Sequence, residues 1–270
     1  MIEAQLPIRR TLAASYRDWR RLLASLRTIV LCAFLIIIAD SAVADFVPEA
    51  LWQHNVAGHV LGLLEDALWA LLLTPVVIAV HRFVIQDVIT SAYTLPLGDP
   101  LYRSFVAWLF ALKVLAGLPF ELLGMMQALG WPLLVSTAGL VVALVAAVAV
   151  ALRLTILLPA IAVQAPSASL TPALADTRGQ ALHILAVFFL ALIPWVILET
   201  VVVIVLGRGI EITGSPRAMI GLLAGGISQT ITLTLSAAAA SHVFRALADA
   251  VNRAPKLQLV HPLSKHHSLQ

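Results

Sequence analysis

The residues best suited to chemistry in this sequence are ionisable side chains inside long apolar stretches. Five of them stand out: Glu65, Asp66, Lys113, Glu121 and Glu199. A charge near the centre of a bilayer costs about 2.5–3.5 kcal/mol on insertion scales, so such side chains should face a helix bundle or water. Two interpretations follow. The five residues form a relay for protons or a substrate, or Lys113 pairs with an acid from another helix and the rest extend to the interface.

The spacing of polar residues predicts two helical stripes. One consists of Lys113, Gly117, Glu121 and Gly124, and the other of Gly221, Gly225, Gln229, Thr232 and Ser236. At 100° per residue each stripe fits within an arc of about 80°. Because glycine lets a neighbouring helix approach closely, we expect both stripes to face the bundle interior and one another. Gln229 would then join the path of the charged residues.

Acidic residues gather toward one side of the expected membrane. Eight of the fourteen lie in the outer half or beyond it: Asp40, Asp45, Glu49, Glu65, Asp66, Glu121, Glu199 and Glu211. This distribution indicates a water-filled outer vestibule that attracts cations, with Lys113 at its base. His54, His59 and Asp66 have side chains that suit Zn or Mn. Their spacing matches no metal motif, so we expect interfacial histidines and no metal.

Motifs that carry catalysis are missing. The sequence has no GxxxxGK[ST], HExxH or GxSxG, and no GxGxxG followed by an acid. Ser228 and Ser236 have no histidine in their stretch before His242, near its cytoplasmic end. Cys32 is the single cysteine and forms no internal disulfide. We expect no catalytic residue, no cofactor and no enzymatic activity.

The elements that position these residues follow from composition. Of 270 residues, 61% are hydrophobic and 11% charged, whereas soluble domains have about 45–50% and 25%. A spanning helix needs about 20 mostly apolar residues. Six stretches qualify: 27–47, 59–85, 104–126, 131–163, 181–206 and 217–247. The predicted fold class is all-α, a polytopic membrane protein with six transmembrane helices in a bundle over 27–247, preceded by an interfacial amphipathic helix.

Arginines and lysines set the expected orientation. Six arginines precede or open the first stretch, and further basic residues follow the second, fourth and sixth stretches. The opposite loops hold only Arg208 and Arg217. By the positive-inside rule both termini are cytoplasmic, including the arm 1–26 and the polar tail 248–270. No basic stripe with interleaved aromatics indicates nucleic-acid binding.

The arm has an amphipathic pattern over 11–26. Leu12, Tyr16, Trp19, Leu23 and Leu26 recur every three or four residues, and the arginines fall elsewhere on the helical wheel. The pattern is typical of a helix on the cytoplasmic leaflet, with aromatics at headgroup depth and arginines near anionic lipid. The expected lipid contacts are Arg17, Trp19, Arg20 and Arg21. The arm either senses lipid or anchors and orients the first span.

A longer pattern begins at Arg153 and an apolar run that ends in Pro159-Ala160. It continues through Thr171-Pro172-Ala173-Leu174-Ala175-Asp176-Thr177-Arg178-Gly179, and the sixth stretch ends Ser241-His242-Val243-Phe244-Arg245-Ala246-Leu247. These segments resemble uncharacterised six-helix bacterial inner-membrane proteins of the YciC-like type. They are also similar to the membrane domain attached to some glycerophosphodiester phosphodiesterases. The resemblance implies a bacterial inner-membrane protein and supplies no catalytic residue.

Two functions are compatible with the sequence. The first is a non-enzymatic envelope scaffold or lipid-associated accessory, with membrane lipid as partner and a homo-oligomer or a membrane-protein partner left open. The second is a small secondary transporter or channel with an outward-facing acidic vestibule. Its path would be lined by Lys113, Glu121, Glu199, Glu65, Asp66 and Gln229. Water access to these residues distinguishes the two functions. In a scaffold the charges form pairs that exclude water, whereas in a transporter water reaches them from at least one side of the membrane.

Overall fold

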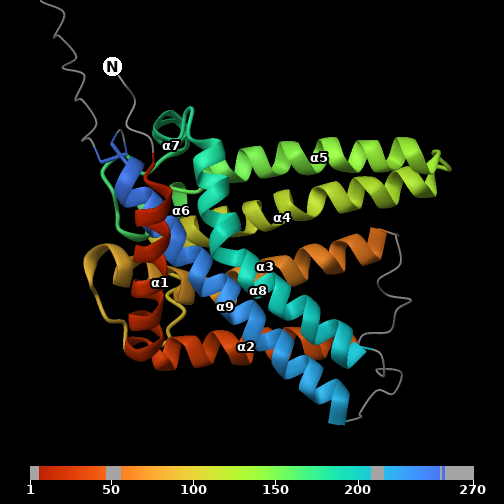
Figure 1. The fold of residues 1–270 in the computed structure, drawn as a ribbon, viewed down its shortest axis with the longest axis horizontal. Coiled ribbons are helices and arrows are strands. Elements are labelled where there is room, and N and C mark those ends of the chain that lie inside the picture. The colour runs from red at the N-terminus through yellow and green to blue at the C-terminus, as the bar shows by residue number, and fades with distance from the viewer. Residues whose placement is uncertain (1–5, 47–55, 208–215, 250, 253–270) are drawn as a thin grey trace, which may run out of the picture.

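The computed structural model describes residues 6–46, 56–207, 216–249 and 251–252, and this part of the chain is all-helical. The helices are α1 (Ile8–Ser25), α2 (Arg27–Phe46), α3 (Val56–Gln86), α4 (Pro100–Ala128), α5 (Leu133–Leu154), α6 (Leu157–Ala162), α7 (Leu170–Asp176), α8 (Ala181–Gly207) and α9 (Pro216–Leu247) (Figure 1). The long helices α2, α3, α4, α5, α8 and α9 form one bundle. The short helices α6 and α7 lie at one end, and the turn between α4 and α5 lies at the other (Figure 1).

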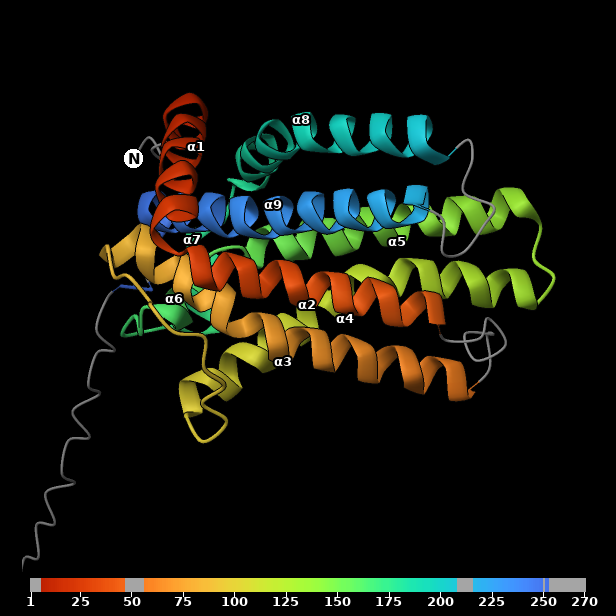
Figure 2. The same ribbon diagram turned by 90° about the horizontal axis from the view of Figure 1, so that it is seen from below.

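The long helices confirm the predicted all-α fold of a membrane protein. Five segments of the described chain are long and apolar enough to cross a membrane: Gly58–Gln86, Pro100–Ala128, Leu133–Ala162, Ala181–Val201 and Met219–Leu247. The pair α1 and α2 adds a sixth if it counts as one bent span. The two helices meet at 93°, so α1 runs across the end of the bundle while α2 runs along it (Figure 2).

The expected helix over 131–163 is interrupted near its end. It forms α5 up to Leu154 and resumes as α6 at Leu157. Pro159 has no N–H with which to bond the Thr155 carbonyl, so an α-helix cannot continue regularly through this point. The interruption begins the link that leads through α7 to α8.

Proline also interrupts the hydrogen bonding of α3, and two tyrosines compensate. Pro75 lies inside α3 and leaves the Leu71 carbonyl without its helical donor. The Tyr102 hydroxyl donates to that oxygen at 2.6 Å, and the Tyr93 hydroxyl donates to the neighbouring Leu72 oxygen at 2.6 Å. Burial raises the pKa of the Tyr93 phenol, which keeps it a donor. The loop before α4 and the start of α4 are thereby fixed to the bend.

In α8 a tyrosine also donates beside a proline, but to the carbonyl three residues before it and not to the one four residues before it. Pro194 lies inside this helix, and the Tyr16 hydroxyl of α1 donates to the Ala191 oxygen at 2.7 Å. Ala191 is three residues before the proline, in the turn that the proline distorts. The bend of α8 is therefore a docking point for α1.

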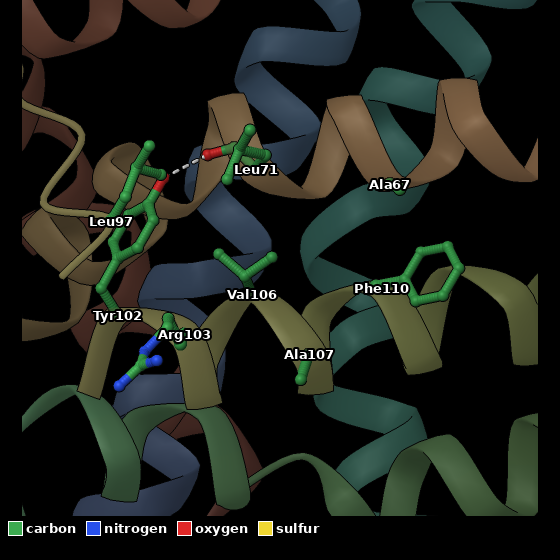
Figure 3. Close-up of a pocket in the computed structure, with 8 residues that line it drawn as sticks. All are labelled: Ala67, Leu71, Leu97, Tyr102, Arg103, Val106, Ala107 and Phe110. Atoms are coloured by element: carbon green, nitrogen blue, oxygen red, sulfur yellow. Dashed lines mark hydrogen bonds between the residues drawn. The ribbon is translucent and has the colours of Figure 1, made fainter. Parts of the chain in front are cut away.

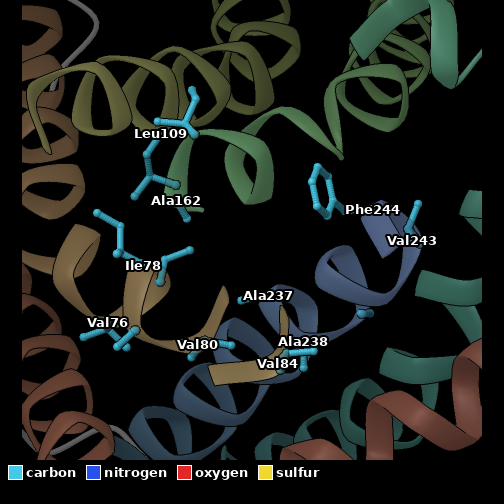
Figure 4. Close-up of a cluster of buried hydrophobic side chains, with 14 of the residues drawn as sticks. Val76, Ile78, Val80, Val84, Leu109, Ala162, Ala237, Ala238, Val243 and Phe244 are labelled. Atoms are coloured by element: carbon cyan, nitrogen blue, oxygen red, sulfur yellow. The ribbon is translucent and has the colours of Figure 1, made fainter. Parts of the chain in front are cut away.

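Figure 4 shows the part of the buried core to which α3, α4, α6 and α9 contribute. The second half of α3 supplies Val76, Ile78 and Val80, all at most 8% exposed. Opposite them, α9 contributes alanines, among them Ala237 and Ala238. Small side chains on one helix let the β-branched side chains of the other pack closely. The buried second half of α3 holds in place the first half, which carries the charged residues.

The segment that carries the family resemblance is a clamp between helices. Arg153 donates from Nη2 to the Leu174 oxygen at 2.9 Å, and the Thr177 hydroxyl lies 2.9 Å from the Arg153 oxygen and 2.8 Å from the Ala173 oxygen, so that its hydrogen is shared between them. The Asp176 carboxylate accepts from the Val251 amide at 3.0 Å. These bonds tie α5, α7 and the segment after α9 together. The motif therefore has a structural role in this chain.

The expected stripe on the sixth span is wrong by one residue. Gly226, Thr230 and Thr234 are buried, whereas Gln229 is exposed. A Cβ on Gly226 would lie 2.7 Å from Ile38 Cγ1 of α2, so this glycine marks the close approach of the two helices. The two predicted stripes also do not lie against one another. The main contacts of α4 are with α5, α3 and α6, and those of α9 are with α8, α2, α3, α1 and α6.

Candidate functional site

The charged residues of α3 and α4 form an ion pair deep in the apolar segment. Lys113 Nζ lies 3.1 Å from Asp66 Oδ1 and 4.3 Å from the centre of the Trp69 ring. The two charged side chains are 30% and 27% exposed. A carboxylate and an aromatic face on the same ammonium both stabilise the charged form. Asp66 lies on another helix, as the second of the two interpretations requires of an acid that pairs with Lys113.

A second pair lies further along the same two helices. His59 Nδ1 is 3.0 Å from Glu121 Oε2, and these side chains are 49% and 58% exposed. Glu121 follows Lys113 by eight residues, about 12 Å along the helix axis. The first predicted stripe is therefore present as a face of α4 that α3 meets through two ion pairs. The surrounding groove has a volume of about 590 Å³ and includes Gly117, Glu121 and Glu65 in its lining.

Two further carboxylates face the ammonium without bonding to it. Asp40 of α2 and Glu65 of α3 interact electrostatically with Lys113 and Asp66. Within the described chain, neither forms a hydrogen bond or an ion pair. Both line a second groove of about 520 Å³ between α2 and α3, with apolar walls. We call Asp40, Glu65, Asp66 and Lys113 the charged cluster. It sets three carboxylates against one ammonium.

A smaller crevice lies between α3 and the start of α4 (Figure 3). Its volume is about 230 Å³, and its lining is apolar apart from Tyr102 and Arg103. Figure 3 shows the Tyr102 hydroxyl turned to the Leu71 oxygen, so its hydrogen is already used. The crevice supplies no reactive group to the charged cluster.

Two of the predicted path residues lie on other helices. Glu199 of α8 accepts a hydrogen bond from the Ser228 hydroxyl of α9 at 2.9 Å. Gln229 is exposed on α9. The main contacts of α8 are with α9, α1 and α5. The structure therefore gathers Glu65, Asp66, Lys113 and Glu121, and it separates Glu199 and Gln229 from them.

The first helix differs from expectation at Trp19. Its side chain is 7% exposed, its Nε1 donates to Thr234 Oγ1 at 3.0 Å, and its ring lies 5.7 Å from that of Trp195. Trp19 is therefore a packing residue between α1, α8 and α9 and does not reach lipid. Its indole N–H finds an acceptor inside the bundle, which favours the inward position. Arg17, Arg20 and Arg21 are exposed, as a lipid contact requires.

Sequence reasoning missed a buried polar group behind α1. Asp18 Oδ2 accepts from His242 Nε2 of α9 at 3.1 Å, and Arg17 and Arg21 also contact this carboxylate. Next to it along α9, the Ser241 hydroxyl donates to the Ala237 oxygen and lies 2.7 Å from His81 Nδ1. His81 must then donate from Nδ1, which leaves its buried Nε2 as an unpaired acceptor.

The signal for this group was present in the sequence. Thr11, Ser15 and Asp18 recur every three or four residues on α1, and all three are buried. A polar stripe with this spacing is as regular as the apolar stripe beside it. It was overlooked because polar residues on an amphipathic helix are expected to face water.

The described residues contain no group of three or more His, Cys, Asp and Glu side chains that could hold a metal ion. His59 and Asp66 are engaged in the two ion pairs, and His54 lies outside the described residues, as do Glu49, Glu211 and most of the tail 248–270. The chain is thus an all-helical protein with helices able to cross a membrane and a charged cluster within them. Comparisons with models of protein families, with curated proteins and with solved structures give no match.

Proposed function

We propose that this chain is a six-span bacterial inner-membrane protein without enzymatic activity, which acts as an envelope scaffold or lipid-associated accessory. Both termini are cytoplasmic, and α1 lies along the inner leaflet. The observation that carries the proposal is α1 itself. It crosses the end of the bundle at 93° to α2 and keeps Arg17, Arg20 and Arg21 exposed. Basic residues held at this depth attract anionic headgroups. The resemblance of the sequence to YciC-like proteins is the reason for proposing the bacterial inner membrane as the location.

Lipid-dependent stability tests this proposal. Anionic phosphatidylglycerol added to the purified protein in detergent should raise its Tm more than phosphatidylcholine with the same chains. The variant Arg17→Gln/Arg20→Gln/Arg21→Gln should lose most of this difference. The control is Arg103→Gln/Arg178→Gln, which removes two exposed arginines outside α1 and should keep it. An equal response of both variants would contradict a lipid role for α1.

The orientation has its own test. A reporter that is active only outside the cytoplasm, fused after Gln270, should remain inactive. The same reporter inserted between α4 and α5 at Gly130 should be active. Activity at the C-terminus would overturn the arrangement with six spans and both termini inside.

A small transporter or channel remains the second candidate, and one observation favours it. Asp40 and Glu65 lie beside Lys113 in open grooves and form no hydrogen bond or ion pair within the described chain. The test starts from Cys32→Ser and places one cysteine at Lys113 or Glu121. Labelling of position 113 in intact cells by a membrane-impermeant maleimide would support a transport path. Labelling restricted to a control cysteine at Gly130 would support sealed pairs and the scaffold.

A further inference from the structure

An apolar groove opens between α2 and α9 beside the corner at which α1 joins α2. Its volume is about 470 Å³. Val30, Leu31 and Phe34 of α2 form one wall, and Ile227 and Ile231 of α9 lie on the other. Leu31 is 55% exposed and Ile227 is 51% exposed. The groove is therefore open to the side of the bundle, where it leaves large apolar side chains uncovered.

Hydroxyl groups in the groove do not make it polar. Thr230 and Thr234 line it as well, but each donates its hydroxyl hydrogen to a backbone oxygen of its own helix. Thr234 also accepts from the Trp19 indole. Threonine hydroxyls bonded in this way present mainly their methyl groups to the groove. An apolar occupant would bury these surfaces without leaving a polar group unpaired.

The corner end of the groove is positively charged. Arg27 belongs to the lining, and its Nε donates to the Ala24 oxygen at 3.1 Å, which leaves both Nη groups for a ligand. Arg20 lies on α1, three residues before the lining residue Leu23 and hence on the same face. It is exposed and has no partner among the described residues. No acidic residue lines the groove.

We propose that this groove binds one acyl chain of an anionic phospholipid, whose phosphate is held by Arg27 and Arg20. The inference rests on the proposed function and gives the lipid a defined site. From Arg27 to Phe34 the wall extends about 10 Å along α2, which suits one leaflet of a hydrocarbon core about 30 Å thick. Guanidinium groups bind phosphate in a bidentate manner.

Native mass spectrometry of the full chain in detergent tests the site. The protein is titrated with phosphatidylglycerol, with phosphatidylcholine of the same chains and with inorganic phosphate. We expect one tightly bound phosphatidylglycerol and no comparable binding of the other two. Arg27→Gln should weaken this binding about fivefold, which corresponds to the ~1 kcal/mol that one arginine contributes near an anionic headgroup.

The acyl-chain part of the site needs a separate variant. Leu31→Trp should fill the groove and reduce phosphatidylglycerol binding while Arg27 is intact. The controls are Arg178→Gln and Leu182→Trp, an exposed arginine and an exposed leucine outside the groove, and both should bind like the wild type. Unchanged Tm values of the variants show that the fold is retained, and Val30→Phe replaces Leu31→Trp if it unfolds.

The outcomes separate this site from the proposed function. If the wild type prefers phosphatidylglycerol but Arg27→Gln and Leu31→Trp bind it normally, the groove is not the site and the role of α1 stands. Phosphate bound through Arg27 with no effect of Leu31→Trp would overturn the acyl-chain assignment. Dimers lost on Leu31→Trp would mean that a second copy covers the groove. Equal binding of both lipids by the wild type would overturn the proposed function as well.

Discussion

At the scale of single residues, Lys113 shows how the chain accommodates charge in an apolar helix. It faces three carboxylates but bonds to one, Asp66, with the Trp69 ring on a further side. Loss of either member of a partly buried pair leaves the other charge without its bonded partner. The pair is thus expected to depend on both residues together.

A double-mutant cycle measures this dependence. Lys113→Met and Asp66→Asn should each lower the free energy of unfolding in mixed detergent micelles, and the double variant should lose less than the sum. We expect a coupling energy of ~1–2 kcal/mol. His59→Gln and Glu121→Gln form the comparison cycle. Because that pair is about half exposed, its coupling should stay below ~0.5 kcal/mol. Equal coupling in both cycles would contradict the importance of burial.

At the scale of elements, the helix bends are held from outside. Pro75 and Pro194 each disturb the bonding of their own helix, and tyrosines from other segments donate to the carbonyls there. An unpaired buried carbonyl would cost about 1–3 kcal/mol. The tyrosines therefore stabilise the bend and fix its neighbours in one step.

The bend of α3 gives a prediction with an internal control. Tyr102→Phe should lower the free energy of unfolding by ~1–2 kcal/mol, because the Leu71 carbonyl loses its donor. In a Pro75→Ala background, residue 75 regains an N–H for that carbonyl. The same Tyr102→Phe change should then cost clearly less in chemical denaturation. An equal cost in both backgrounds would show that the tyrosine acts through packing alone.

Two adjacent glycines of α9 give a second prediction at this scale. Gly226→Ala should lower the free energy of unfolding by ~1–3 kcal/mol, because the new methyl group would meet Ile38 Cγ1 at 2.7 Å. Gly225→Ala is the matched control, since nothing lies within 4 Å of its added Cβ. It should be neutral or slightly stabilising through helix propensity. If Gly225→Ala lowered the free energy of unfolding more than Gly226→Ala, this would contradict the orientation of α9 about its own axis, in which Gly226 faces α2.

At the scale of the whole molecule, α1 joins parts of the chain that are far apart in sequence. Asp18 bonds His242, Trp19 bonds Thr234 and Tyr16 bonds Ala191. Asp18→Asn should weaken the docking of α1, because a buried charge-assisted bond contributes ~1.5–3 kcal/mol. Amide hydrogens of 8–25 should exchange about tenfold faster, with little change in α5. The control is Arg20→Gln, which removes an exposed arginine of α1 that does not contact Asp18, and exchange in α1 should stay close to the wild type.

Sequence patterns predicted the positions of the helices better than they predicted which face of each helix is buried. The apolar stretches predicted the long helices, and the helical spacing predicted that Lys113 and Glu121 share a face. The choice of Asp66 over Asp40 or Glu65 as partner depends on how α2, α3 and α4 pack, which no local pattern encodes. Likewise, the buried face of α9 is set by the contact of Gly226 with Ile38, and Gly225 has the same intrinsic properties. Trp19 was misplaced because its acceptor, Thr234, lies 215 residues away.

The docking of α1 also determines the order in which the molecule can be completed. A ribosome releases α1 first, yet its hydrogen-bond partners on α8 and α9 are 175 to 224 residues later. Contacts at such separation form late, because a long chain must first be brought together. Throughout synthesis Tyr16, Asp18 and Trp19 remain without their final partners. The last helix of the chain, α9, is thus the one that completes the docking of the first, α1. If translation is arrested before α9 is made, α1 should remain accessible to protease.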